Sequence, residues 1–345
     1  MVSSASRCQN TRSDTAVTHT ESASQNSTQS IEPMPKQLTI VMYHYVRPME
    51  NTRFPSLKAL SLERFLRQLD HIAANYHPVS ATDLFAALQD ASFPLPERAI
   101  LLTFDDGYAD HYQYVLPALK QRGMTGCFFP SVEPVQQRKV LDVNKIQFML
   151  ASFPHVDELL SQTFQQINAY RGEYDLPDES QFRERIREQH RYDQPETILF
   201  KRLLQRELPF KVRHEIVHRL FTKYVTEDEL SFASELYMSE SQLRTMIAEA
   251  MHIGCHGFSH EWMDHLTPDQ QTVEVDESIR FLKALHPQPF ELSICYPYGG
   301  FNSLLLHLLR QRGFRAGFSV EPRVADLAAE DPLLLPRLDT NDLPS

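Results

Sequence analysis

The segment Ala99-Ile-Leu-Leu-Thr-Phe104, followed directly by Asp105-Asp-Gly-Tyr108, decides the fold. A near-continuous apolar run of this length is typical of a strand that is buried on both faces in a parallel sheet. Parallel α/β folds place their reactive groups at the carboxyl ends of such strands. Asp105 and Asp106 lie at this end and point in different directions, because side chains alternate along the chain, so one can hold a metal ion while the other handles a proton. Asp-Asp-Gly is also a good turn sequence, and on its own it favours a function and a plain turn equally.

Strands and helices alternate on both sides of this segment. Upstream, Leu38 to His44 is a short β-rich run, and the apolar spacing from Leu62 to Ala73 predicts a helix that Ser61 caps. Downstream, we expect a helix over about 112 to 122 and a strand from Thr125 to Phe129. This order predicts parallel strands that are joined by helices.

Residues 141–235 interrupt the alternation. They hold long amphipathic helical stretches, such as Val156 to Ile167 and Val212 to Tyr224, and no β-rich run. The alternation resumes at Ser239, which begins a capping box, and continues to a last strand expected at about Leu333 to Leu338. The pattern predicts an α/β barrel or sheet that carries a mainly helical insertion over residues 141–235.

Length and composition agree with this organisation. At about 150 residues per domain, 345 residues give roughly two domains, and a single barrel with an insertion fits equally well. Residues 1–36 are rich in Ser, Thr, Gln and Asn and have almost no large apolar side chains. Such a segment buries too little surface to offset its ordering entropy, so we expect a disordered polar tail.

Charge and cysteine content exclude several classes of protein. A net charge of −11 argues against a non-specific nucleic-acid binder, and no apolar run is long enough for a membrane span. The start of the chain lacks the apolar core of a secretory signal. The four scattered cysteines are typical of a reducing compartment, which together with the missing signal predicts a cytoplasmic protein. They are Cys8, Cys127, Cys255 and Cys295.

His256 and His260 form a candidate metal-binding pair. With 15 histidines in the chain, chance supplies about 0.6 pairs at this spacing, so the spacing by itself favours surface histidines on a loop. The context adds weight, because Ile253-Gly-Cys255 before the pair reads as a strand end. Two imidazoles and one carboxylate form a facial triad that leaves positions open for water and substrate.

Two further strand ends carry candidate residues. Tyr296-Pro-Tyr-Gly-Gly300 forms a tight turn that can aim a backbone N–H at a developing oxyanion, although an ordinary strand-to-helix turn explains it equally well. His44 ends the first strand, where it can be a catalytic acid or a core histidine with satisfied hydrogen bonds. Taken alone, the core histidine is the favoured interpretation.

Three segments, in order, resemble the first three motifs of the polysaccharide deacetylases with the NodB-homology domain, carbohydrate esterase family four. The segments are Thr103-Phe-Asp-Asp-Gly-Tyr108, Cys255-His-Gly-Phe-Ser-His260 and Tyr296-Pro-Tyr-Gly299. The resemblance covers about residues 38–130 and 236–340. It implies a distorted, TIM-like (β/α)7 barrel within residues 37–345 that hydrolyses an acyl group from an amino sugar by means of one divalent metal ion.

The resemblance also implies roles for individual residues. The expected metal ligands are Asp106, His256 and His260, with Zn as the first choice of ion and Co, Mn or Ni as alternatives. Asp105 resembles the general base that activates the attacking water, and the backbone N–H of Tyr298 would complete the oxyanion hole. Tyr108 and Pro297 are expected on the same substrate and oxyanion side of the site.

The chain departs from the family pattern in two places. Cys295 stands where the family often has an arginine that orients the base, and Arg337 is the candidate substitute. The family's final motif is a late strand that ends in the histidine that serves as general acid, and this motif is missing. The opening strand that ends at His44 resembles this element moved to the N-terminus, as in some permuted poly-N-acetylglucosamine deacetylases. We therefore expect His44 to be the general acid, with His265 as the fallback.

The sequence thus predicts a metal-dependent hydrolase that removes an acyl group, N-acetyl first, from an amino sugar or a small sugar conjugate. Two alternatives remain open: hydrolysis of another C–N bond, such as an N-formyl sugar or a cyclic amide, and an inactive relative that binds a carbohydrate or a protein. The insertion at 141–235 is expected to be a substrate-selecting cap or, equally, a homodimerisation element. No nucleic-acid partner is expected.

Overall fold

The computed structural model describes residues 36–50, 52–187 and 193–344. These residues belong to one compact unit. The predicted disordered tail, apart from Lys36, lies outside them.

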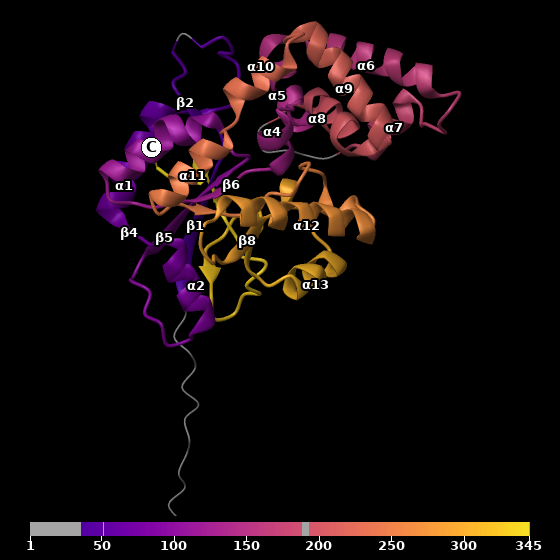
Figure 1. The fold of residues 1–345 in the computed structure, drawn as a ribbon. Helices are drawn as coiled ribbons and strands as arrows, with labels where there is room; N and C mark the ends of the chain where they lie inside the picture. Colours follow the sequence, from indigo (N-terminus) through magenta and orange to yellow (C-terminus); the bar gives the residue numbers. More distant parts are fainter. Residues whose placement is uncertain (1–35, 51, 188–192, 345) are drawn as a thin grey trace, which may run out of the picture. The chain divides into compact units, whose positions relative to one another are not determined.

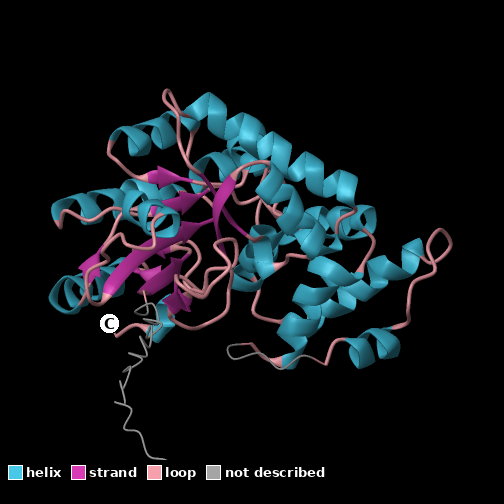
Figure 2. Ribbon diagram, turned by 90° about the horizontal axis from the view of Figure 1, so that it is seen from below, coloured by secondary structure: helices cyan, strands magenta, loops and turns pink. Residues whose placement is uncertain are grey.

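Parallel strands form the centre of the unit (Figures 1 and 2). The apolar run quoted above is β5 (Ala99–Asp105), every residue of which is buried. It pairs in parallel with β1 (Gln37–Tyr43) on one side and with β6 (Cys127–Phe129) on the other. β7 (His252–Ile253) follows β6 in the same sheet. A second sheet consists of β8 (Leu292–Cys295) and β9 (Phe314–Phe318).

Backbone hydrogen bonds join the two sheets into a ring. On one side, the Cys255 N–H donates to the Ser293 carbonyl at 2.8 Å. On the other side, the Leu335 N–H donates to the Gly317 carbonyl at 2.8 Å. The chain then enters β11 (Leu338–Asp339), which pairs in parallel with β1 and closes the ring. The predicted distorted (β/α)7 barrel is confirmed.

The last strand of the barrel is shorter than predicted. We expected a strand from Leu333 to Leu338, but regular pairing occurs only in β11. Pro332 and Pro336 flank Leu335, and a proline has no N–H to donate to a neighbouring strand. The segment therefore follows its neighbour through isolated contacts and becomes a regular strand only after the second proline.

Four short strands were not predicted from the sequence. They are β2 (Val46–Arg47), β3 (Leu60–Ser61), β4 (His77–Pro78) and β10 (Ala325–Asp326). β10 is antiparallel to the start of β1. Two-residue strands of this kind have no periodicity that a sequence pattern can reveal.

The helices outside the predicted insertion are α1 (Leu62–Asn75), α2 (Ala81–Gln89), α3 (Leu116–Gln121), α4 (Val132–Gln137), α11 (Glu240–Ala248), α12 (Pro268–Leu285) and α13 (Ser303–Gln311). Ser61 caps α1 by accepting from the Arg64 N–H, as predicted, and Ser239 begins the capping box of α11. The helix expected over 112–122 is split, because His111–Val115 forms a π-helical turn before α3.

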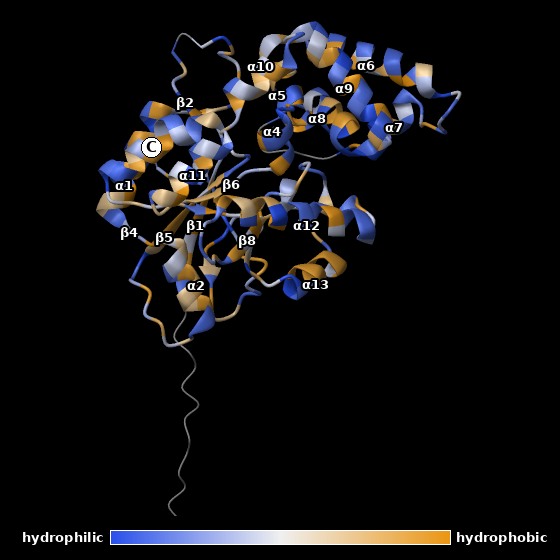
Figure 3. Cartoon of the chain, viewed as in Figure 1, coloured by the Kyte–Doolittle hydropathy of each residue, from blue (hydrophilic) through white to orange (hydrophobic). Residues whose placement is uncertain are grey.

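The described part of residues 141–235 contains helices and no strand. They are α5 (Asp142–Ser152), α6 (Val156–Tyr170), α7 (Glu179–Arg185), α8 (Pro195–Arg202), α9 (Phe210–Tyr224) and α10 (Glu229–Leu236). Hydrophobic and hydrophilic residues alternate along these helices, whereas the central strands are mainly hydrophobic (Figure 3). The inward faces form a core of their own around Ile146, Phe200 and Phe221, which Tyr45 and Tyr108 of the barrel join.

None of the helices within the described ranges has the length and apolar character needed to cross a lipid bilayer.

Candidate active site

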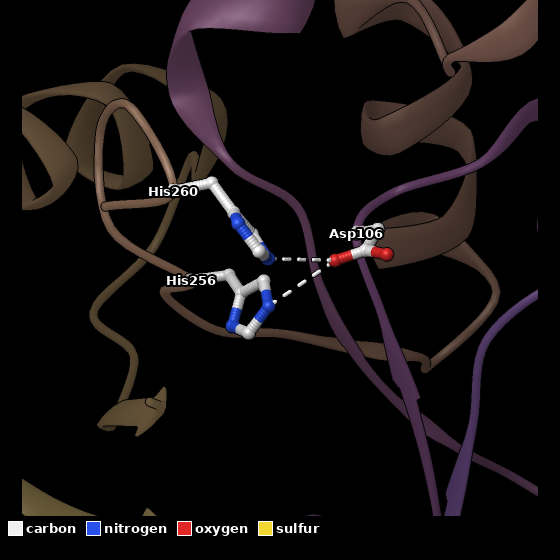
Figure 4. Close-up of side chains that lie close together, drawn as sticks. All are labelled: Asp106, His256 and His260. Carbon is white, nitrogen blue, oxygen red and sulfur yellow. Dashed lines mark ion pairs between the residues drawn. The ribbon is translucent and has the colours of Figure 1, made fainter. Parts of the chain in front are cut away.

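The side chains of Asp106, His256 and His260 meet at one point (Figure 4). Asp106 Oδ1 lies 3.2 Å from Nε2 of each histidine, and all three residues are buried. Burial opposes the ionisation of Asp106, but the two histidines beside it hold the pKa of this carboxyl well below its usual range. The carboxylate is therefore ionised, as a metal ligand must be.

The chemistry of these three groups fits a divalent metal ion. Asp106 Oδ1 is buried and makes no hydrogen bond within the described residues. The His256 Nδ1–H donates to the Cys295 carbonyl at 2.9 Å, which leaves the Nε2 lone pair for a metal. A buried carboxylate oxygen that faces two imidazole nitrogens is a donor set that suits Zn and other first-row divalent ions.

A tight turn at the end of β5 aims Asp106 at the histidines. Asp106 has φ of 71° and Gly107 has φ of 73°, in the left-handed region that disfavours side chains. A Cβ atom on Gly107 would lie 2.6 Å from Pro130 Cβ, so only glycine fits here. The Asp-Asp-Gly segment thus forms a tight turn and also carries candidate site residues. The plain turn and the functional segment, the two interpretations of the sequence, both apply.

Glu274 on α12 holds the loop that carries both histidines, and sequence reasoning missed it. Its carboxylate accepts from the backbone N–H groups of Phe258 and Ser259, at 2.6 and 3.0 Å, and from the Ser259 hydroxyl at 2.5 Å. Burial raises the pKa of Glu274 while the Ser259 hydrogen bonds oppose the rise. One sequence feature could have identified Glu274. Its spacing from Ser278 and Phe281 places an acidic residue on the buried face of the helix.

Asp105 is held by Arg337. The Arg337 guanidinium donates to Asp105 Oδ1 at 2.9 Å and to Oδ2 at 2.8 Å, and Arg337 is only 1% exposed. Burial disfavours the charged form of Asp105, but the positive charge of Arg337 lowers the pKa to about 2. Arg337 Nη1 also lies 3.0 Å from Cys295 Sγ. Arg337 therefore lies directly beside Cys295, the residue that stands where the family often has an arginine.

His44 lies on the opposite side of Asp105. Its Nε2 is 4.0 Å from Asp105 Oδ2, and its side chain is 42% exposed. The backbone at this point is fixed because the His111 Nε2–H donates to the His44 carbonyl at 2.8 Å. Burial lowers the pKa of His111 to about 4, so His111 is neutral. His265, the fallback acid, stacks near Trp262 in a neighbouring cavity and does not line the cavity of Asp105, so the structure does not support it.

The three residues expected on the substrate side differ in position. Tyr298 lines the same cavity as Asp105, and its ring packs edge-on against His260 with centroids 4.8 Å apart. The expectation for Tyr108 requires correction, because this residue is fully buried and its hydroxyl donates to Asp106 Oδ2 at 2.5 Å. Pro297 is also buried and absent from the described cavity wall. Neither residue is among those that line the cavity.

One cavity of about 260 Å³ connects these groups. Its walls include His44, Asp105 and Asp106 from the barrel. The predicted insertion contributes a further set of lining residues: Val143, Gln147, Asp193, Ile198, Lys201, Arg202 and Gln205. The insertion therefore forms one wall of the cavity that contains the candidate metal site.

The polysaccharide deacetylase family model matches residues 93–156 and 220–317. These two segments, a little under half of the chain, are similar to the polysaccharide deacetylase domain. Residues 157–219, within the predicted insertion, lie outside the match. A putative polysaccharide deacetylase, YxkH of Bacillus subtilis strain 168, is 30% identical over 95 residues. This alignment covers 28% of the chain and spans about a third, 32%, of that relative.

Several solved structures share the fold of this chain. The Streptococcus pyogenes deacetylase PplD, in complex with acetate, has a TM-score of 0.57 at 17% identity and covers 90% of this chain and 95% of its own. IcaB from Ammonifex degensii has a TM-score of 0.50 at 18% identity, with 88% and 91% covered. The BpsB deacetylase domain from Bordetella bronchiseptica has a TM-score of 0.51 at 14% identity, with 88% and 95% covered.

We predict that Glu274→Ala weakens metal binding by about tenfold to a hundredfold, the range typical of residues that orient metal ligands. The alanine leaves two buried N–H groups of the histidine loop without an acceptor, so the loop loses its fixed conformation. The measurement is a zinc titration against a competing chelator. Glu274→Gln keeps an acceptor for both N–H groups and should retain most of the affinity. Glu277→Ala, on the same helix, is the matched control, and equal affinity of Glu274→Ala and this control would contradict the assignment.

Proposed function

We propose that this domain is a metal-dependent hydrolase that removes an N-acyl group, acetyl in the first instance, from an amino sugar or sugar conjugate. The observation that carries the proposal is that a His/His/Asp group and a separately held carboxylate face one cavity in a deacetylase-family fold. Acetyl is favoured because the family and its solved relatives are described as deacetylases.

Asp106, His256 and His260 would hold one divalent metal ion, with Zn as the first choice and Co, Mn or Ni as alternatives. When bound, such an ion polarises the acyl carbonyl and acidifies water. The buried ligand residues supply two neutral donors and one charge, which leaves a net positive site for a carbonyl oxygen.

Asp105 is proposed as the general base. Because Arg337 keeps this carboxylate ionised and engages both of its oxygens, it can accept a proton from the attacking water without rotating away. Asp105 and Asp106 are adjacent but serve different partners, which supports a division between proton transfer and metal binding.

His44 is proposed as the general acid. Its side chain is partly exposed and lines the same cavity as Asp105, so it can give a proton to the leaving amine nitrogen of a substrate bound there. The Tyr298 backbone N–H is proposed for the oxyanion hole, since the turn that carries it lies beside His260.

The insertion is proposed as a substrate-selecting cap rather than a dimerisation element. Its contribution of seven residues to the wall of the cavity supports this choice. An open groove would accept any stretch of a polymer, whereas a cavity bounded by helices restricts what can reach the metal. An inactive relative is disfavoured because the candidate ligands, base and acid all lie at one cavity.

We predict that Asp105→Asn retains the metal ion but lowers kcat by about 10²–10⁴-fold, the usual contribution of a general base. The measurement is acetate release from a panel of N-acetylated amino sugars, with formate release from N-formyl sugars followed in parallel and metal content determined after dialysis. Asp106→Asn is the comparison, since it should lose the metal itself. A kcat of Asp105→Asn close to that of the wild type would remove Asp105 from the mechanism.

We predict that His44→Ala removes the fall in rate at high pH. A general acid must be protonated, so the wild-type rate should decrease at high pH, and a variant without the group has no such decrease. The pH dependence of kcat/KM between pH 5 and 10 gives the measurement. A lower rate with an unaltered bell-shaped profile would show that another group is the acid.

A further inference from the structure

Gln147 on α5 is a cavity residue that the proposed mechanism does not use. It is half-buried and lines the same cavity as Asp105 and Asp106. It belongs to the predicted insertion, at a position that the first matched segment of the family model, residues 93–156, still includes.

A chain of hydrogen bonds leads from the metal site to the neighbourhood of Gln147. It begins at Asp106, whose Oδ2 accepts from the Tyr108 hydroxyl at 2.5 Å. The Tyr108 oxygen then accepts from Asn144 Nδ2 at 2.7 Å. The nitrogen end of the Asn144 amide therefore faces Tyr108.

The contacts at the other end of Asn144 agree with this orientation. The Leu141 N–H donates to the Tyr237 hydroxyl oxygen at 3.0 Å. The Tyr237 hydroxyl in turn donates to Asn144 Oδ1 at 2.5 Å. Tyr108 has used its proton on Asp106 and can only accept from Asn144, which assigns the nitrogen of the amide. The Tyr237 hydroxyl then donates to the oxygen.

Asn144 in turn orients Gln147. Gln147 Oε1 accepts from Asn144 Nδ2 at 3.1 Å and from the Tyr45 hydroxyl at 2.8 Å. If the Gln147 amide were reversed, its nitrogen would face the Asn144 nitrogen, and two donors would oppose each other. The oxygen of Gln147 therefore faces the network, and its nitrogen is the polar end that remains for the cavity.

This nitrogen is a fixed donor without a protein acceptor. Nε2 of Gln147 donates no hydrogen bond to any residue in the described ranges of the chain. The groups that hold the amide are themselves immobile, since Asn144 is fully buried and the Tyr45 ring stacks on Tyr108 with centroids 4.0 Å apart. A donor that is already oriented before binding loses little entropy when a ligand accepts from it.

We propose that Gln147 is a specificity-determining residue that donates a hydrogen bond from Nε2 to a hydroxyl oxygen of the acylated amino sugar. The inference rests on the proposed function, because its ligand is the sugar that the domain deacylates. A neutral amide donor beside two carboxylates matches a neutral sugar hydroxyl and disfavours a ligand that presents an anionic group at this point.

The test compares Gln147→Met and Gln147→Glu with the wild type on the N-acetylated amino sugar that the wild type turns over best. Methionine keeps the length of the side chain and removes the donor, so KM should rise about threefold to tenfold, as for the loss of one neutral hydrogen bond, while kcat changes less than about twofold. Glutamate removes the donor and adds a charge beside Asp105, so KM should rise further. Tyr45→Phe removes one of the two hydrogen bonds that Gln147 Oε1 accepts, so it should give a smaller rise in KM than Gln147→Met.

Gln162→Met on α6 is the matched control, because Gln162 bonds only to Glu158 and Lys223 on the exposed surface and should leave KM unchanged. Zinc affinity is measured for each variant, since a purely structural role of Gln147 would disturb Asp106 through Asn144 and Tyr108. Unchanged KM in both Gln147 variants, or a loss of zinc affinity in Gln147→Met that parallels the rise in KM, would overturn the inference while the proposed function stands. Absence of turnover of every acylated amino sugar by the wild type would overturn the proposed function, and this inference with it.

Discussion

The buried ion pair between Asp105 and Arg337 is the interaction on which the site depends. Asp105 ends β5, and Arg337 lies in the segment that closes the barrel against β1. Two charges removed from water are stable only as a well-bonded pair, and loss of one partner typically costs about 3–5 kcal/mol. Arg337 satisfies this demand, because it also donates to the Ser319 carbonyl and to the Thr103 hydroxyl, both at 3.0 Å. The segment that closes the ring therefore also supplies the partner that holds the Asp105 carboxylate.

The helical insertion is coupled to the metal site through polar contacts as well as through the wall it forms. Both of its ends reach the Asp106 turn: Asn144 near the start bonds to Tyr108, and the Met238 N–H just after its end donates to the Gly107 carbonyl at 3.0 Å. Tyr108, a residue of the family motif, thus connects Asp106, a candidate metal ligand, to the start of the helical insertion. A change in the insertion can consequently alter both the space for substrate and the orientation of a metal ligand.

Much of this architecture could be predicted from the sequence, for identifiable physical reasons. The run Ala99 to Phe104 has to be buried, so β5 and the carboxylates at its end follow from hydrophobicity. Arg337 and His44 could be proposed only through the family resemblance and the adjacency of first and last strands in a closed barrel, and the structure brings both to Asp105. Their catalytic roles stay predictions. Other features depend on tertiary contacts that leave no local pattern, such as the loop held by Glu274 and the inward direction of Tyr108.

The most direct test of this account is a double-mutant cycle on the pair, with the free energy of unfolding measured for Arg337→Met, Asp105→Asn and the double variant. We expect Arg337→Met to lose about 3–5 kcal/mol, because it leaves a buried carboxylate uncompensated. The double variant has no uncompensated charge, so it should be more stable than Arg337→Met alone. Strictly additive losses, or a single Arg337→Met variant as stable as the wild type, would contradict the claim that this pair holds the site together.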